Sequence, residues 1–204
     1  MRTIKLCFGA GNGVDTACLM TAVSIVTGAE SPNDSPSCVC PILRAFIVKC
    51  NDNMPDALRS ELFTPLIWEL PGTQTTAENQ ILRAKVFVHG SQILAARAAA
   101  AAAAYAAVDA DVAAAAARAA SAAADVAADA ADAAAVYAAA YAAAYAARAA
   151  AYAAYAADVA AAYADVREIY EYCVTLIRVA MSIGDKRPVE IVKTPEQLAL
   201  QLNR

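Results

Sequence analysis

The feature that most constrains this chain is a segment of 93 residues, positions 91–183 between Gly90 and Gly184, that contains neither glycine nor proline. Alanine fills 48 of the 70 positions from 95 to 164. Because alanine loses no side-chain entropy in a helix, the segment is expected to be helical. Alanine also buries little apolar area, so the hydrophobic core has to come from the rest of the chain. We therefore predict an all-α protein.

Composition divides the 204 residues into three predicted parts. Residues 1–94 have a mixed composition with glycine and proline at intervals, and we expect a compact N-terminal helical domain. Residues 95–183 are predicted to be one long alanine-rich helix, and residues 184–204 a C-terminal tail with a short helix. Apolar residues occupy both sides of the long helix near its C-terminal end, so that end is expected to dock back on the domain.

Local signals predict where the shorter helices begin. Asp15 is a suitable N-cap for the first helix, and prolines at positions 41 and 55 suit first turns. Thr75 and Glu78 have the spacing of a capping box and open a fourth helix. In the tail, Thr194 is expected to cap a last helical turn that begins at Pro195. The four ranges predicted in the domain are 16–27, 41–49, 56–63 and 75–88.

The alanine-rich segment is either one straight rod or a folded hairpin. A broken helix has no reason to keep its side chains in phase across the break. From Ala133 to Ile183 the larger side chains stay in phase, which favours a continuous helix there. Before Asp132 such residues are sparse, and a bend near Ser121 stays an open alternative.

A row of tyrosines is the most regular pattern in the sequence. From Tyr137 to Tyr170, tyrosine or valine recurs every three or four residues, and Arg148 is the charged exception on this face. Core seams between helices usually use Leu or Ile, whereas tyrosine is enriched in binding hot spots. We predict either a contact seam or a ligand- or partner-binding face. The candidate binding residues are Tyr137, Tyr141, Tyr145, Arg148, Tyr152 and Tyr155.

Six cysteines occur in a chain without a recognisable secretion signal, so we expect thiols rather than disulfides. Zinc needs four sulfur or nitrogen ligands in a tetrahedron. The C-x-C spacing of Cys38 and Cys40 is not the usual C-x2-C knuckle, and there is no second pair. Buried core thiols are therefore expected, with no metal and no cofactor, and a metal site or a reactive thiol is the alternative. The available ligands are Cys7, Cys18, Cys38, Cys40, Cys50 and His89.

Other catalytic or phosphate-binding patterns are incomplete. The glycines at positions 9, 11 and 13 precede a predicted helix, and free N–H groups at a helix N-terminus bind anions. No strand–helix–strand unit follows, so a flexible turn is the better interpretation. His89, the single histidine, lies at a predicted helix junction before Gly90, and nothing in the sequence orients it against a cysteine. We therefore predict that the protein is not an enzyme.

Charge and hydropathy limit the partners. Sixteen basic and twenty acidic residues give a net charge of −4, which argues against nucleic acid and against anionic membranes. No uncharged apolar run reaches the roughly 18–20 residues of a spanning helix. We expect a cytoplasmic protein.

Three short motifs precede the alanine-rich segment. They are Cys18-Leu19-Met20-Thr21-Ala22, then Cys38-Val39-Cys40-Pro41 followed by Arg44-Ala45-Phe46, and Asn51-Asp52-Asn53-Met54-Pro55-Asp56. Over residues 15–75 the chain resembles a group of bacteriophage and bacterial proteins that end in long helices rich in Ala, Tyr, Asp and Arg. No activity or catalytic residue comes with that resemblance. It implies a phage or bacterial accessory protein, in the host cytosol if phage-encoded.

The function predicted from the sequence is non-enzymatic binding by a homo-oligomer associated through the tyrosine and alanine seam. One concrete form is counter-defence, in which a host protein or a small signalling nucleotide is sequestered in a crevice lined by tyrosines and Arg148. The first alternative is a purely structural helical protein that builds an oligomer. The second is a thiol- or metal-dependent enzyme centred on the N-terminal cysteines.

Overall fold

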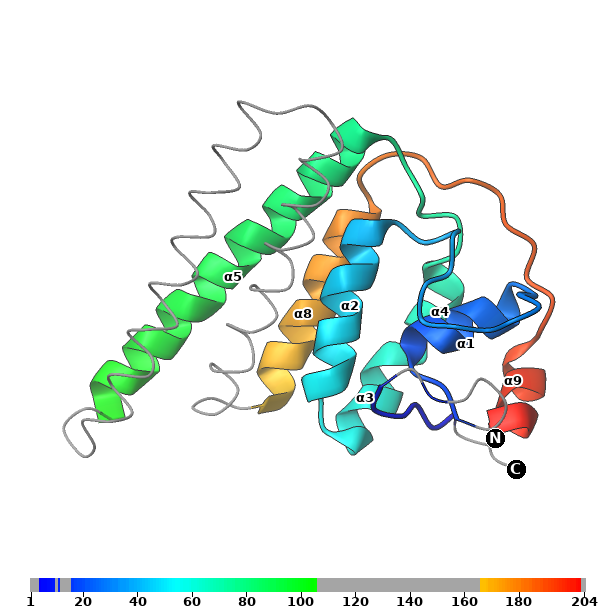
Figure 1. Cartoon of the computed structure of the whole chain (residues 1–204). Helices are drawn as coiled ribbons and strands as arrows, with labels where there is room; N and C mark the ends of the chain where they lie inside the picture. The colour runs from blue at the N-terminus through cyan, green and yellow to red at the C-terminus, as the bar shows by residue number, and fades with distance from the viewer. Residues whose placement is uncertain (1–3, 10, 12–15, 106–165, 203–204) are drawn as a thin grey trace. The chain divides into compact units, whose positions relative to one another are not determined.

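The computed structural model describes residues 4–9, 11, 16–105 and 166–202 (Figure 1). Over these residues the regular secondary structure is α-helix, with one isolated antiparallel bridge between Gly11 and Ala17. The predicted all-α class is confirmed. The chain divides into two compact units, the first made of Met1–Thr75 with Gly184–Arg204 and the second of Thr76–Ile183.

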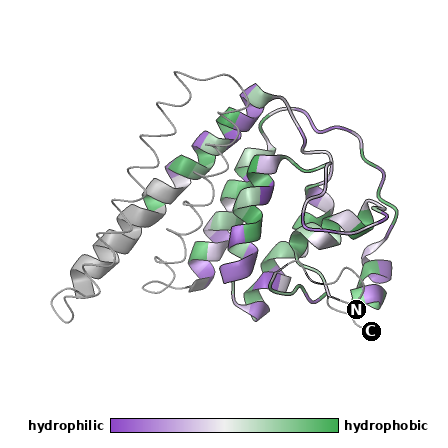
Figure 2. Ribbon diagram, viewed as in Figure 1, coloured by the Kyte–Doolittle hydropathy of each residue, from purple (hydrophilic) through white to green (hydrophobic). Residues whose placement is uncertain are grey.

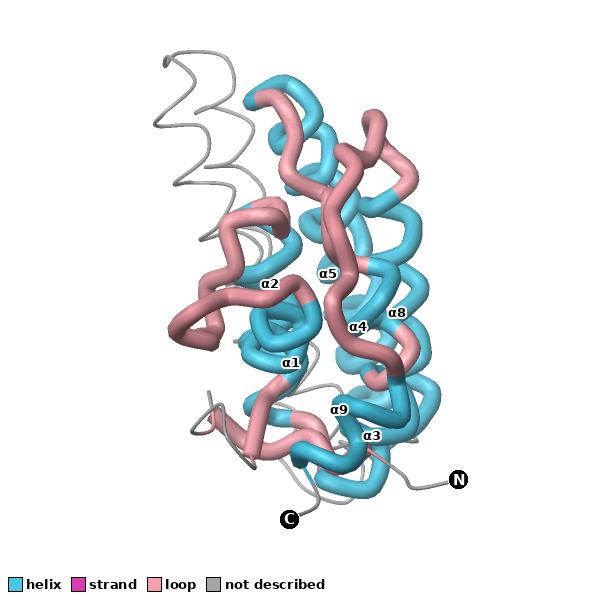
Figure 3. Tube along the Cα trace, turned by 90° about the vertical axis from the view of Figure 1, so that its right-hand side faces the viewer, coloured by secondary structure: helices cyan, strands magenta, loops and turns pink. Residues whose placement is uncertain are grey.

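The first unit is built around α1 (Leu19–Val26). All eight residues of α1 are buried, and Figure 2 shows the helix as apolar along most of its length. It contacts α2, α4 and α9, and Figure 3 shows it among these elements. A short, mostly apolar helix thus forms the core of the unit. The helices around it are α2 (Pro41–Asn53), α3 (Asp56–Phe63), α4 (Leu66–Glu69) and α9 (Pro195–Leu202).

Sequence signals located most of these helix starts. The predicted range 56–63 is that of α3, and α2 begins at Pro41 as expected but continues to Asn53. The prediction of Asp15 as the first N-cap is wrong, because α1 begins at Leu19. Its N-cap is Cys18, whose Sγ accepts a hydrogen bond from the backbone N–H of Thr21 at 3.4 Å.

The last helix begins where the sequence predicted it. The hydroxyl of Thr194 accepts from the backbone N–H of Gln197 at 3.3 Å. In return, the side-chain oxygen of Gln197 accepts from the backbone N–H of Thr194 at 2.8 Å. This reciprocal pair is a capping box, and it satisfies two donors that a helix start otherwise leaves unpaired.

Residues 184–194 run along the first unit and lead into α9 (Figure 1). We call this segment the C-terminal strap. Two backbone hydrogen bonds hold the strap in place. The N–H of Arg187 donates to the carbonyl of Gly72 at 2.8 Å, and the N–H of Val192 donates to the carbonyl of Val26 at 2.8 Å. The strap forms neither helix nor strand, so these two bonds and its side chains fix its course.

The second unit pairs α5 (Ala77–Tyr105) with α8 (Val166–Met181) in antiparallel orientation. The guanidinium of Arg83, near the start of α5, donates two hydrogen bonds to the carbonyl of Ile183, at 2.7 and 3.2 Å. Further along, Gly90 lies against the side chain of Leu176. A single straight rod over 91–183 is therefore excluded. Most of the favoured continuous helix, residues 133–165, lies outside the described residues.

The predicted helix end at Val88 is wrong, because α5 continues through Gly90 to Tyr105. Its start also differs from the prediction, since the hydroxyl of Thr76 accepts from the N–H of Asn79 at 3.4 Å. A Cβ on Gly90 would overlap Cδ1 of Leu176 and lie 3.0 Å from its Cγ. Gly90 therefore lets α8 approach α5 closely, and it does not break the helix. None of the helices in the described ranges has the length and apolarity needed to cross a membrane.

Replacing Gly90 with alanine is expected to lower the free energy of unfolding, although alanine is the better helix former by about 1 kcal/mol. The new Cβ overlaps a buried leucine, and overpacking of this kind costs about 1–3 kcal/mol. Urea denaturation followed by circular dichroism measures the change.

The double variant with Leu176→Ala is the control for this packing. With Leu176 shortened, Gly90→Ala should become neutral or stabilising by up to about 1 kcal/mol, because only its helix propensity remains. A destabilisation of the same size in both backgrounds would show that Leu176 is not the side chain that constrains position 90.

Candidate functional site

The tyrosine face predicted as a binding surface lies outside the described residues. Tyr137, Tyr141, Tyr145, Arg148, Tyr152 and Tyr155 all fall between positions 106 and 165. Their role stays a prediction.

Several cysteines lie at helix ends or at backbone hydrogen bonds that hold the fold together. All six are free thiols. Cys18 caps α1, the N–H of Cys40 donates to the hydroxyl of Thr73 at 3.2 Å, and the carbonyl of Cys38 accepts from the N–H of Gln74 at 3.2 Å. Within the described ranges, no group of three or more His, Cys, Asp or Glu side chains is placed to hold a metal ion.

The thiol of Cys7 has a raised pKa. Burial raises the pKa of its thiol, and the neighbouring Cys18 raises it further. Since the thiolate is the reactive species, a raised pKa lowers the reactive fraction at neutral pH. His89, the single histidine of the chain, is exposed on α5 in the second unit.

Three described backbone donors near the glycine-containing turn and the start of α1 bond within the protein. The N–H of Leu19 donates to the side-chain oxygen of Asn51 at 3.4 Å, and that of Thr21 donates to Cys18. The N–H of Gly9 donates to the carboxylate of Asp52 at 3.1 Å. Because these donors are engaged within the protein, the phosphate-loop alternative gains no support from the structure.

The residues 51–56 that carried part of the resemblance join elements of the first unit. The side-chain amide of Asn51 donates to the carbonyl of Cys7 at 3.1 Å. Arg59, which is 3% exposed, donates to the carbonyls of Asn51 and Met54 at 2.8 and 2.6 Å and to Asp56 at 2.6 Å. This motif has a structural role, because Arg59 holds its carbonyls at the end of α2 and the side chain of Asn51 holds the N-terminal segment at Cys7.

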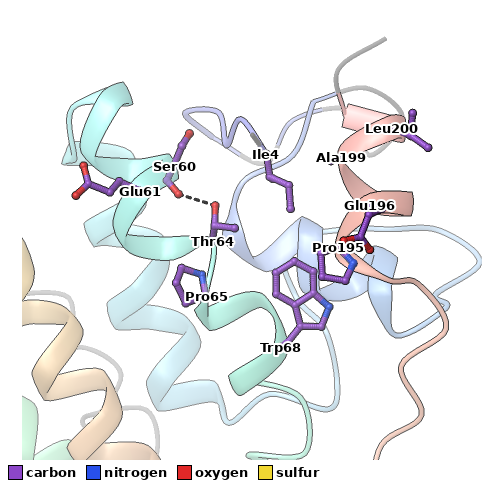
Figure 4. Close-up of a pocket in the computed structure, with 10 residues that line it drawn as sticks. All are labelled: Ile4, Ser60, Glu61, Thr64, Pro65, Trp68, Pro195, Glu196, Ala199 and Leu200. Carbon is purple, nitrogen blue, oxygen red and sulfur yellow. Dashed lines mark hydrogen bonds between the residues drawn. The ribbon is translucent and has the colours of Figure 1, made fainter. Parts of the chain in front are cut away.

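A pocket of about 560 Å³ is the best candidate site in the described part of the chain (Figure 4). It lies wholly within the first unit, between the N-terminal segment, α3, α4 and α9. A volume of about 300–1,000 Å³ is typical of small-ligand pockets. Its apolar lining comes from Ile4, Pro65, Trp68, Pro195, Ala199 and Leu200.

The polar residues of the pocket are two hydroxyls and two carboxylates. The hydroxyl of Ser60 accepts from the N–H of Leu6 at 3.0 Å, and that of Thr64 donates to the carbonyl of Ser60 at 2.5 Å. Glu196 lies on the side of Trp68, whereas Glu61 points away along α3 (Figure 4). None of the described residues that line the pocket is positively charged. The charged groups of the described lining are therefore the two carboxylates.

Trp68 is the most distinctive residue of the pocket. It is the single tryptophan of the chain, and its side chain is partly exposed. Its indole Nε1 is buried and has no hydrogen-bond partner among the described residues. The ring surface, rather than the covered N–H, is the part that a ligand meets.

Sequence reasoning did not find this pocket. Its residues come from positions 4, 60–68 and 195–200, which no local pattern connects. The one available signal was the lone tryptophan among apolar residues at 65–68, and a sequence does not show whether such a ring is exposed. No family model matches the chain, and neither a curated protein nor a solved structure matches it.

Proposed function

We propose that this chain acts by binding, without chemical conversion of its ligand or partner. The observation that supports this most directly is the pocket at Trp68, which has apolar walls, an accessible aromatic ring and a carboxylate on one side. Apolar walls with a few polar groups are typical of binding sites.

The hydrogen-bonding pattern of the first unit supports the same proposal. The side chains of Asn51, Asp52 and Arg59 form hydrogen bonds with backbone groups of turns and helix ends. Cys18 caps a helix and Cys7 has a raised pKa. These groups stabilise the fold, so they do not favour the thiol- or metal-dependent alternative.

In its fuller form, the proposal is a cytoplasmic phage or bacterial accessory protein that sequesters a host protein or a small signalling nucleotide. The tyrosine face would supply the oligomer contacts and the nucleotide site, with Arg148 toward the phosphates. This assignment rests on the sequence pattern and on the resemblance. The acidic side of the Trp68 pocket does not suit a nucleotide.

Native mass spectrometry of protein purified gently from cells tests the proposal. The expected spectrum shows an assembly that retains additional mass. Replacing Tyr141, Tyr145 and Tyr152 together with leucine should lower the retained fraction at least tenfold, because buried tyrosines at a binding surface contribute about 1 kcal/mol or more each. Helicity by circular dichroism should stay unchanged.

Tyr105→Leu is the matched control, since it changes a tyrosine of the alanine-rich segment outside the candidate set. A triple variant that keeps its partner and assembles more tightly would instead support the structural alternative, in which the tyrosines form only a seam. A bare monomer without retained mass would contradict both the oligomer and the binding function.

A further inference from the structure

We infer that the pocket at Trp68 binds an organic cation, an ammonium group with apolar substituents placed against the indole ring. This inference rests on the proposed binding function and names the ligand class of one site. Three observations carry it: the accessible tryptophan ring, the apolar walls and the placement of charge around the pocket.

The tryptophan ring supplies a surface that attracts cations. The face of an indole is the most effective aromatic partner for a cation, through the negative charge density above the ring. Trp68 lines the pocket with a partly exposed side chain, and its N–H is covered. The ring is therefore available as a surface, while the hydrogen-bond donor is not.

The walls select the substituents of the cation. Ile4, Pro65, Pro195 and Leu200 present aliphatic groups to the pocket. A strongly hydrated ammonium ion would lose its water without replacement there, whereas an alkylated ammonium places methyl or methylene groups against these walls. The pocket thus matches a cation whose charge is covered by apolar substituents.

The described residues that line the pocket carry charge of a single sign. Figure 4 shows the Glu196 side chain beside Pro195 on the Trp68 side, and Glu61 directed away. Glu196 lies in the first turn of α9, where the helix dipole stabilises a carboxylate. With the carboxylate of Glu196 and no cation among the described lining residues, the field in the pocket favours a positive ligand.

Such a cation has two sources, a free small ammonium compound or the trimethylated lysine side chain of another protein. The two share one chemistry and differ in what surrounds the charge. Choline is a suitable probe for the first source, and Nα-acetyl-Nε-trimethyl-lysine methylamide for the second. The alcohol 3,3-dimethylbutanol has nearly the shape of choline without its charge, so it is the neutral control.

Trp68 also provides the measurement. Because it is the single tryptophan, fluorescence excited at the red edge of the absorption band reports on this pocket alone. Choline is expected to change the emission at a concentration at least threefold lower than 3,3-dimethylbutanol does, and the difference should shrink at high salt. Tighter binding of the lysine derivative than of choline would identify a protein side chain as the source.

Variants locate the site. Glu196→Gln should weaken choline binding about threefold, and Glu61→Gln by less than that because its side chain points away. Trp68→Leu should weaken it about fivefold, read by ligand-observed NMR because the fluorophore is lost. Glu190→Gln, an exposed change on the strap that does not line the pocket, is the control.

Equal responses to choline and to 3,3-dimethylbutanol, or no response to either probe, would overturn the inference. An equal loss of choline affinity in Glu190→Gln and Glu196→Gln would also overturn the inference, because the loss would then reflect the net charge of the protein. None of these results affects the mass-spectrometric test, so a binding protein with another ligand class would still be recognised.

Discussion

Replacing Arg59 with methionine is expected to lower the free energy of unfolding by about 3–5 kcal/mol. The guanidinium is nearly fully buried and donates to two backbone carbonyls at the end of α2 and to the carboxylate of Asp56. Methionine fills a similar volume, but it leaves the carbonyls of Asn51 and Met54 without their donors. Urea denaturation followed by circular dichroism measures the loss.

Asp56→Asn is the matched control because it changes the third partner of the same guanidinium. The Asp56 side chain is 92% exposed, so losing this ion pair should cost less than about 1 kcal/mol. Arg59→Lys should fall between the two, since one ammonium does not reproduce the planar fork that reaches all three acceptors. Equal losses for Arg59→Met and Asp56→Asn would show that the ion pair, and not the capping of α2, is what Arg59 contributes.

A buried arginine also binds a backbone carbonyl at a helix end in the second unit. Arg83 is fully buried, and its guanidinium donates to the carbonyl of Ile183, two residues beyond the end of α8. A positive charge at the C-terminal end of a helix pairs with the unsatisfied carbonyls and with the helix dipole. In each unit, a buried arginine therefore holds the end of a neighbouring helix. In sequence, both residues resemble ordinary surface charges of a helix.

The helices that sequence reasoning predicted well depend on local chemistry. Pro41 begins α2 because its fixed φ suits a first turn, and Thr194 pairs with Gln197 three residues later. Such interactions are complete within four residues, so a linear pattern contains all the information they need.

The predictions that were wrong involve partners distant in sequence. Asp15 is a better N-cap residue than cysteine in general, yet α1 begins after Cys18, where Asn51 from α2 accepts from the N–H of Leu19. Gly90 had the appearance of a helix end, but its missing side chain makes room for Leu176. Tertiary contacts outweighed local preference at both positions.

The pocket at Trp68 was out of reach of sequence reasoning for the same reason. Its two sides, at Trp68 and at Pro195, are joined only when α9 packs against α1 and the strap follows the first unit. The tyrosine row is the opposite case, because its periodicity is plain in the sequence and its residues lie outside the described structure. The chain therefore has two independent candidate binding surfaces, the Trp68 pocket and the tyrosine face, and each has its own test.

Replacing Gly72 with alanine is expected to lower the free energy of unfolding by about 2–4 kcal/mol and to release the C-terminal strap. Gly72 has a φ of +79°, which costs an alanine about 1 kcal/mol. In addition, the new Cβ would overlap the backbone oxygen of Arg187. Because that backbone also donates to the carbonyl of Gly72 at 2.8 Å, relieving the overlap breaks this hydrogen bond.

Gly9→Ala separates the two contributions to this loss. Gly9 has a φ of +66°, and a Cβ there meets no atom within 4 Å, so this variant should lose only about 1 kcal/mol. Limited trypsin digestion measures the accessibility of the strap. The bond after Arg187 precedes Pro188 and resists trypsin, so the cleavable sites of the strap are Lys186 and Lys193. In Gly72→Ala these sites should be cleaved at least tenfold faster, because a detached strap exposes its backbone to the protease. Equal stability losses and unchanged strap cleavage in the two variants would mean that positive φ alone explains Gly72, and that the strap does not depend on its contact with Arg187.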